Sequence, residues 1–189
     1  LAVHISEGRL DERLDISVYE GLDREIREEI NALINAVLLP YQFMAEKIRL
    51  ISTGEIPDRI EEEFSGAFED TRNNLNQCID AINLLVSDGL LLTKAMDDGH
   101  LDIRTDSSRH QGQFRAVIDG FNHTLDAVIR PLNVCAEYMD RISKGDLPPK
   151  ITDKYHGDFN DIKNNLNQCI DAIRRMVSDA QILARAAQE

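Results

Sequence analysis

The sequence predicts an all-α fold in which long helices form parallel homodimeric four-helix coiled-coil bundles, stacked end to end through continuous helices. Three observations predict it: few aromatic residues, apolar residues at heptad spacing, and an internal repeat whose loops are bounded by glycines. Aromatic residues make up 5% of the chain and Trp is absent, which favours helix packing over strand-rich cores.

Composition excludes several classes of protein. The 189 residues are 42% hydrophobic and carry a net charge of −13, which argues against disorder and against a basic surface for nucleic acid. No apolar run approaches the roughly 18 residues that a membrane span needs, so we expect no direct membrane insertion. Three widely spaced cysteines predict neither a disulfide framework nor a zinc site. The first residues lack an initiator Met and a leader, so we expect a piece of a longer protein.

The chain contains a duplicated module. Sliding the sequence by 91 residues aligns positions 8–98 with 99–189 without a gap, and 37 of the 91 pairs are identical. The densest stretch, NNLNQCIDAI at 73–82, returns unchanged at 164–173. Such identity is far above chance, and we call the two copies repeat 1 and repeat 2.

Each repeat divides again into two loop-and-helix units. Four glycines open the loops, a second glycine closes each loop after 12 or 13 residues, and an asparagine always follows the closing glycine by ten. The opening glycines are Gly8, Gly54, Gly99 and Gly145, the closing ones are Gly21, Gly66, Gly112 and Gly157, and the asparagines are Asn31, Asn76, Asn122 and Asn167. We expect a partial unit at 1–37, units at 38–85 and 130–176, a divergent unit at 86–129, and the first helix of a further unit at 177–189.

The helices are predicted between these loops by steps of four and three residues between apolar positions, as from Phe114 to Ile142. Each helix is about 30 residues long, or roughly 45 Å. Additional apolar positions widen the stripe beyond a two-stranded seam and favour a four-helix bundle. The expected dimer core comprises Leu75, Cys78, Ile82, Phe121, Leu125, Val128, Leu166, Cys169 and Ile173.

The loop length predicts that consecutive helices are parallel. Antiparallel helices need only about 2 to 5 connecting residues, whereas these loops reach about 40 Å when extended, enough to run back along a helix. Apolar residues would pin each loop between the helices. They are Leu10 with Leu14, Ile56 with Ile60, Leu147 with Ile151 and, in the third loop, Leu101 with Ile103 in place of polar Thr105. One unit supplies only two helices, so a second chain must supply the others, giving a parallel homodimer.

Taken together, these motifs resemble tandem HAMP domains, the helix, connector, helix modules of bacterial chemoreceptors and sensor histidine kinases. The matching features are Pro40 and Pro131, the strings Gly54-Glu-Ile-Pro and Gly145-Asp-Leu-Pro, and the turns at Gly66 and Gly157. The resemblance implies a relay of conformational signals between input and output domains of one parent chain, in the cytoplasm. The units at Gly8 and Gly99 carry Asp11 and Asp102 where the others have proline, and resemble a divergent type that alternates with the ordinary one.

Other roles for the notable residues are less favoured. No grouping predicts catalysis, a metal or a cofactor, so we do not expect an enzyme. We expect the five histidines and the Glu61–Glu63 run to be solvated, and Cys78 and Cys169 to be small buried hydrophobes. Pro40 and Pro131 fit either a hinge between layers or a tolerated first-turn proline. A passive spacer rod and a partner-binding helical array remain alternatives to a relay.

Overall fold

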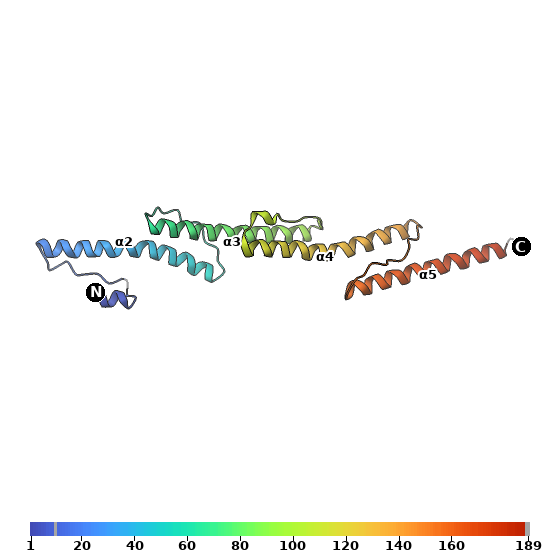
Figure 1. Ribbon diagram of the computed structural model, residues 1–189, viewed down its shortest axis with the longest axis horizontal. Coiled ribbons are helices and arrows are strands. Elements are labelled where there is room, and N and C mark those ends of the chain that lie inside the picture. Colours follow the sequence, from blue (N-terminus) through green and yellow to red (C-terminus); the bar gives the residue numbers. More distant parts are fainter. Residues whose placement is uncertain (10, 188–189) are drawn as a thin grey trace. The chain divides into compact units, whose positions relative to one another are not determined.

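The computed structural model describes residues 1–9 and 11–187, and over these ranges its regular elements are all helices (Figure 1). Four are long: α2 (Gly21–Ser52), α3 (Ala67–Asp97), α4 (Gly112–Ser143) and α5 (Asp158–Ala186). A short α1 (Ala2–Ser6) precedes them, and a 3-10 turn, η1 (Ser107–Arg109), precedes α4. The long helices have 29 to 32 residues, so the predicted helix length is confirmed.

The chain forms two compact units, Leu1–Leu91 and Leu92–Glu189. Helix α3 begins in the first unit and ends in the second without interruption. None of the helices in the described ranges is both long and apolar enough to cross a membrane.

Four connectors link the helices, and we number them in chain order: 8–20, 54–66, 99–111 and 145–157. Each connector begins at a glycine that ends the preceding helix. At the fourth, Gly145 has φ +79°, its N–H donates to the Ile142 carbonyl, and the Asp146 N–H donates to the Arg141 carbonyl, both at 3.0 Å. This paired arrangement is the Schellman motif, whose left-handed residue favours glycine. Equivalent bonds occur at Gly8, Gly54 and Gly99.

Each connector runs back along the helix that follows it. In the second connector, Arg59 pairs with Asp80, Ile60 with Asn76, and the Glu62 carbonyl with Arg72. Residue numbers rise along the connector while they fall along α3, so the two segments are antiparallel. The fourth connector does the same on α5, with Pro148, Lys150 and Ile151 bonded to Arg174, Asp171 and Asn167.

Within the first unit, α2 and α3 run in the same direction, as predicted (Figure 1). The second half of α2 lies beside the end of the connector and the start of α3. The Phe43 and Phe64 rings are 6.3 Å apart between centroids, and a hollow is lined by Met44 and Ile48 of α2 together with Thr71 of α3. The long connector therefore lets two consecutive helices lie parallel.

The positions of the two prolines contradict one of the two interpretations that the sequence allowed. Pro40 and Pro131 lie in the interior of α2 and α4, so the first-turn interpretation is wrong. An interior proline has no N–H to donate, which leaves the carbonyl four residues earlier, at Ala36 or Ala127, without its usual helical donor. Both helices nevertheless continue through the proline.

Candidate functional site: the connector clamps

A single asparagine side chain fastens each connector to the following helix. In the second connector, Asn76 Oδ1 accepts from the Ile60 N–H at 2.8 Å and Asn76 Nδ2 donates to the Ile60 carbonyl at 3.0 Å. Asn76 is 5% exposed. Because an amide side chain offers one acceptor and a donor group side by side, it satisfies both backbone groups of one extended residue. We call this asparagine with its bonded residue a clamp.

The clamp occurs four times at equivalent positions. Asn31 holds Leu14, Asn122 holds Thr105 and Asn167 holds Ile151, each through the residue's N–H and carbonyl. The donor-acceptor distances lie between 2.8 and 3.0 Å except for the Thr105 N–H to Asn122 Oδ1, which is 3.3 Å. These are the asparagines that follow each closing glycine by ten. Sequence reasoning noted their spacing but assigned them no role.

Apolar burial reinforces the second and fourth clamps. Ile60 and Ile151 are 3% and 5% exposed, and Ile79 and Ile170, three residues after each clamp asparagine, are fully buried. The other predicted pins, Ile56 and Leu147, are half-buried, as is Leu14 of the first connector. Leu10 lies outside the described residues.

The third connector contradicts the prediction that Ile103 replaces Thr105. Thr105 is 6% exposed and occupies the clamped position, whereas Ile103 and Leu101 are 37% and 38% exposed. The physical reason is that Asn122 bonds backbone groups, so the clamp fixes the register whatever side chain the held residue carries. As a result the Thr105 hydroxyl is buried with no hydrogen-bond partner among the described residues.

A second contact accompanies every clamp. The residue immediately before the held one is basic, and it reaches the side chain four residues after the clamp asparagine. The pairs are Arg13–Asn35, Arg59–Asp80, Arg104–Asp126 and Lys150–Asp171. We call these pairs latches. Their partners lie on the helix turn next to the clamp, and sequence reasoning missed them because neither residue type is unusual on an exposed surface.

Among the three charged latches, that of the third connector has the least exposed basic residue. Arg104 is 26% exposed, against 60% for Arg59 and 48% for Lys150, whereas the three carboxylates are similarly exposed. The hydrogen bond from Arg104 lowers the pKa of Asp126, and the positive charges of Arg104 and Arg130 add to this effect.

The first and third connectors share a turn that the other two lack. Asp15 Oδ1 accepts from the N–H and hydroxyl of Ser17, and Asp106 Oδ1 accepts from the Ser108 N–H. Hydrogen bonds from these serines lower the pKa of both carboxyls. In the third connector, Asp106 thereby caps η1.

Two expectations about polar residues have different outcomes. Glu61, Glu62 and Glu63 are exposed, as expected for a solvated loop face. His110 is 5% exposed, so the expectation that the histidines are solvated is wrong for this residue. The reason is its place just before α4, where the third connector closes onto its helix. Within 1–9 and 11–187, no group of acidic, histidine or cysteine residues is arranged to hold a metal ion.

The predicted dimer-core positions are exposed or half-buried in the single chain. Phe121 and Val128 are 45% and 42% exposed. Cys78 and Cys169, which were expected to be buried, are exposed in the single chain because no connector covers them. The remaining members, Leu75, Ile82, Leu125, Leu166 and Ile173, are half-buried. We call these nine positions the seam face.

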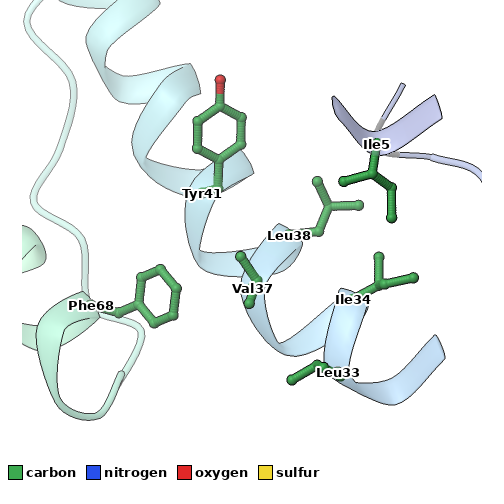
Figure 2. Close-up of a pocket in the computed structure, with 7 residues that line it drawn as sticks. All are labelled: Ile5, Leu33, Ile34, Val37, Leu38, Tyr41 and Phe68. Atoms are coloured by element: carbon green, nitrogen blue, oxygen red, sulfur yellow. The ribbon is translucent and has the colours of Figure 1, made fainter. Parts of the chain in front are cut away.

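A hollow on α2 is lined by apolar residues. It has a volume of about 350 Å³ and is lined by Ile5, Leu33, Ile34, Val37, Leu38, Tyr41 and Phe68. Figure 2 shows Phe68, at the start of α3, pointing toward Val37 and Tyr41, while Ile5 of α1 faces Leu38. Leu33, Val37 and Tyr41 are each more than half exposed, so one wall of the hollow is uncovered.

Comparison with known proteins gives one family. The family model described as HAMP domain matches residues 18–84 and 109–175. The two matches are offset by 91 residues at both ends (109 − 18 and 175 − 84), the same offset as the sequence repeat. No solved structure matches the chain.

Proposed function

Because these matches cover more than half of its length, the chain belongs to the HAMP domain family, and we propose that it relays conformational signals between other parts of its parent protein. HAMP domains are non-catalytic signal-relay modules of receptors and kinases, and they function as dimers.

We propose that two chains associate in parallel and in register along the seam face. Supporting this, one chain leaves apolar side chains uncovered at heptad spacing along its long helices, among them Phe121 and Val128. A monomeric protein rarely exposes so continuous an apolar surface. A second copy, presenting the same stripe, covers it and completes a four-helix layer in each unit.

The relay is proposed to pass through helices that belong to two units at once. The first half of α3 holds the second connector through Asn76, while its last turns, with Leu92 and Ala95 buried, belong to the following compact unit. A shift or rotation of α3 in one unit therefore enters the next unit through an unbroken helix. Such a relay needs two packings that differ by only a few kcal/mol.

We propose a partial unit at 1–37, units at 38–85, 86–129 and 130–176, and an opening helix at 177–189. The glycines that begin and end the connectors, with the held residues, are the proposed signalling positions. We also propose that the parent is a chemoreceptor or a sensor histidine kinase, with these units on its cytoplasmic side.

The native cysteines provide a test. Cys78 and Cys169 occupy the same seam position in repeats 1 and 2, so each meets its own counterpart in a parallel dimer. In a Cys135→Ser background, the rates of interchain disulfide formation with copper phenanthroline are measured separately at Cys78 and Cys169. Sedimentation of the same protein should show a dimer. A monomer, or no cross-linking at either position, contradicts the parallel arrangement.

The relay itself is tested by perturbing one unit and observing another. Ile60→Ala loosens the second clamp, and a relay changes the cross-linking rate at the distant Cys169 by about twofold or more while helix content stays unchanged. Glu62→Ala, at an exposed position of the same connector, is the matched control. A rigid spacer leaves the Cys169 rate unchanged in both variants, and that result rejects the relay.

A further inference from the structure

The seam face has equivalent residues in the two repeats, whereas the two repeats differ strongly in charge. We propose that the seam face also pairs with a second copy of the chain in a shifted register, with repeat 1 of one chain parallel to repeat 2 of the next. Such pairing leaves one repeat of each chain uncovered, so further copies add head to tail into an open assembly. The inference rests on the seam face being an interface, as proposed above.

The α3 and α5 parts of the seam face do not distinguish the two registers. Leu75, Cys78 and Ile82 lie in the stretch 73–82, which returns unchanged at 164–173. Their exposure also agrees between the repeats, because both cysteines are exposed and the leucine and isoleucine of each repeat are half-buried. A second copy shifted by 91 residues therefore meets the same side chains at the same spacing.

The α4 part of the seam face has apolar equivalents on α2. Each of its three residues corresponds to one that lies 91 positions earlier: Phe121 to Ile30, Leu125 to Ile34 and Val128 to Val37. Ile30 and Val37 are 37% and 52% exposed, against 45% and 42% for Phe121 and Val128. Both registers therefore cover apolar side chains with apolar side chains, and burial alone does not reject the shifted pairing.

Net charge separates the two registers. Repeat 1 contains nine basic and 20 acidic residues, a net charge of −11, whereas repeat 2 contains 12 basic and 13 acidic residues, a net charge of −1. The in-register dimer places two −11 repeats beside one another, while the shifted pairing places each beside a repeat that is nearly neutral. Like charges held side by side oppose association and disfavour the register that brings them together.

Much of the charge difference arises around the second connector. Seven exposed acidic side chains lie between residues 55 and 70, whereas the equivalent positions of repeat 2 hold three acidic residues and one lysine. The seven are Glu55, Asp58, Glu61, Glu62, Glu63, Glu69 and Asp70.

Two opposing effects set the balance between the registers. An in-register partner covers both repeats in one association event, which favours the closed dimer at low chain concentration. Repulsion between the two −11 repeats favours the shifted pairing, and salt weakens this repulsion because the screening length falls from about 20 Å at about 20 mM salt to about 4 Å at about 500 mM. The shifted assembly should therefore form at low salt and high chain concentration, and closed dimers should replace it as salt rises.

The native cysteines distinguish the registers by the products of a brief oxidation with copper phenanthroline. In Cys135→Ser chains, an in-register dimer joins Cys78 to Cys78 and Cys169 to Cys169, so non-reducing electrophoresis shows nothing larger than a dimer. A shifted pair joins Cys78 of one chain to Cys169 of the next and leaves a thiol at each end, which gives a ladder of longer products. We expect the fraction of chains in the ladder to fall about fivefold or more between about 20 and 500 mM NaCl. Adding Cys78→Ser provides the control, because chains with one thiol cannot extend beyond a dimer.

Four results overturn the proposal. Products that stop at the dimer at every salt concentration, with only like cysteines joined, reject the shifted register and leave the in-register dimer standing. Dimers that contain Cys78–Cys169 links without a ladder indicate a closed antiparallel pair. A ladder that does not decline with salt removes the role of charge. An absence of interchain links in every condition rejects the seam face itself, and both pairings with it.

Two double variants test whether the charge difference between the repeats selects the register. Glu61→Thr with Glu63→Lys gives repeat 1 the exposed residues of repeat 2, and Thr152→Glu with Lys154→Glu does the reverse. Each narrows the charge difference between the repeats from ten to seven, although the first makes the whole chain less acidic and the second more acidic.

Both variants should reduce the ladder at low salt by about twofold or more. The energy of each pair of repeats is proportional to the product of their charges, so the repulsion relieved by the shift grows with the square of the charge difference. If the two variants change the ladder in opposite directions, total charge controls association and the proposal is wrong.

Discussion

Neighbouring residues on α3 meet opposite environments. Ile79 is fully buried beside the clamp asparagine, whereas Cys78, the residue before it, is exposed on the seam face. The same contrast recurs on α5 between Ile170 and Cys169. One side of each helix, which we call the clamp face, is covered by the chain's own connector, and the other is left uncovered. A single chain therefore covers only one of the two faces of each helix. Substitutions on the clamp face and on the seam face should accordingly have separate effects.

The largest effect is expected on the seam face. Val128→Lys places two lysines in the apolar interior of a symmetric dimer and removes the burial of two valines, each contributing about 1.5 kcal/mol or more. We expect the dissociation constant to rise at least about 100-fold. Sedimentation velocity measures this, with the exposed, off-seam substitution Asn133→Lys as control. If both variants remain dimeric at micromolar concentration, the seam face is not the interface.

Next in size is loss of the fully buried clamp-face side chains. Ile79→Ala and Ile170→Ala should each lower the free energy of unfolding by about 2–5 kcal/mol, because each leaves a cavity under a connector. Urea unfolding followed by circular dichroism measures the change. Asn74→Ala, at an exposed position of α3, should cost no more than about 0.5 kcal/mol. A loss below about 1 kcal/mol for both isoleucine variants would mean that the connectors contribute little to stability.

The sequence predicts the helices better than the clamps. Heptad spacing and the repeated glycines predict helix lengths, the connectors and the parallel course of α2 and α3, because these depend on local periodicity and on loop length. Thr105 was misjudged because the prediction ranked side chains by apolarity. The clamp instead selects a backbone position, and the signal for it was the asparagine ten residues after each closing glycine. The latches needed three-dimensional contacts, because Arg104 and Asp126 lie 22 residues apart.

The third prediction concerns the clamp asparagines. Asn167→Ala removes both partners of the Ile151 backbone and leaves its N–H and carbonyl unsatisfied, at a cost of about 1–3 kcal/mol. The expected result is faster exchange of the Ile151 amide and a matching loss of stability, with dimerisation retained. The neighbouring Asn165→Ala, exposed on the same turn, provides a control of identical chemistry. Equal effects of the two variants would show that the bonds to Ile151 have no role in holding the connector.

The smallest effect tests whether the third connector differs from the fourth through its held residue. Thr105→Val has nearly the same volume and removes a buried hydroxyl without a partner, so it should stabilise the chain by about 1 kcal/mol. The reciprocal change, Ile151→Thr, introduces such a hydroxyl and removes apolar volume, and should destabilise by about 1–2 kcal/mol. Thermal unfolding of both variants against the parent chain measures the pair. The two changes in stability must have opposite signs, because one substitution removes a buried hydroxyl from the held residue and the other introduces one at the equivalent clamp. A destabilising Thr105→Val would show that the hydroxyl gains a partner in solution, and the contrast between these connectors would then lie in their latches alone.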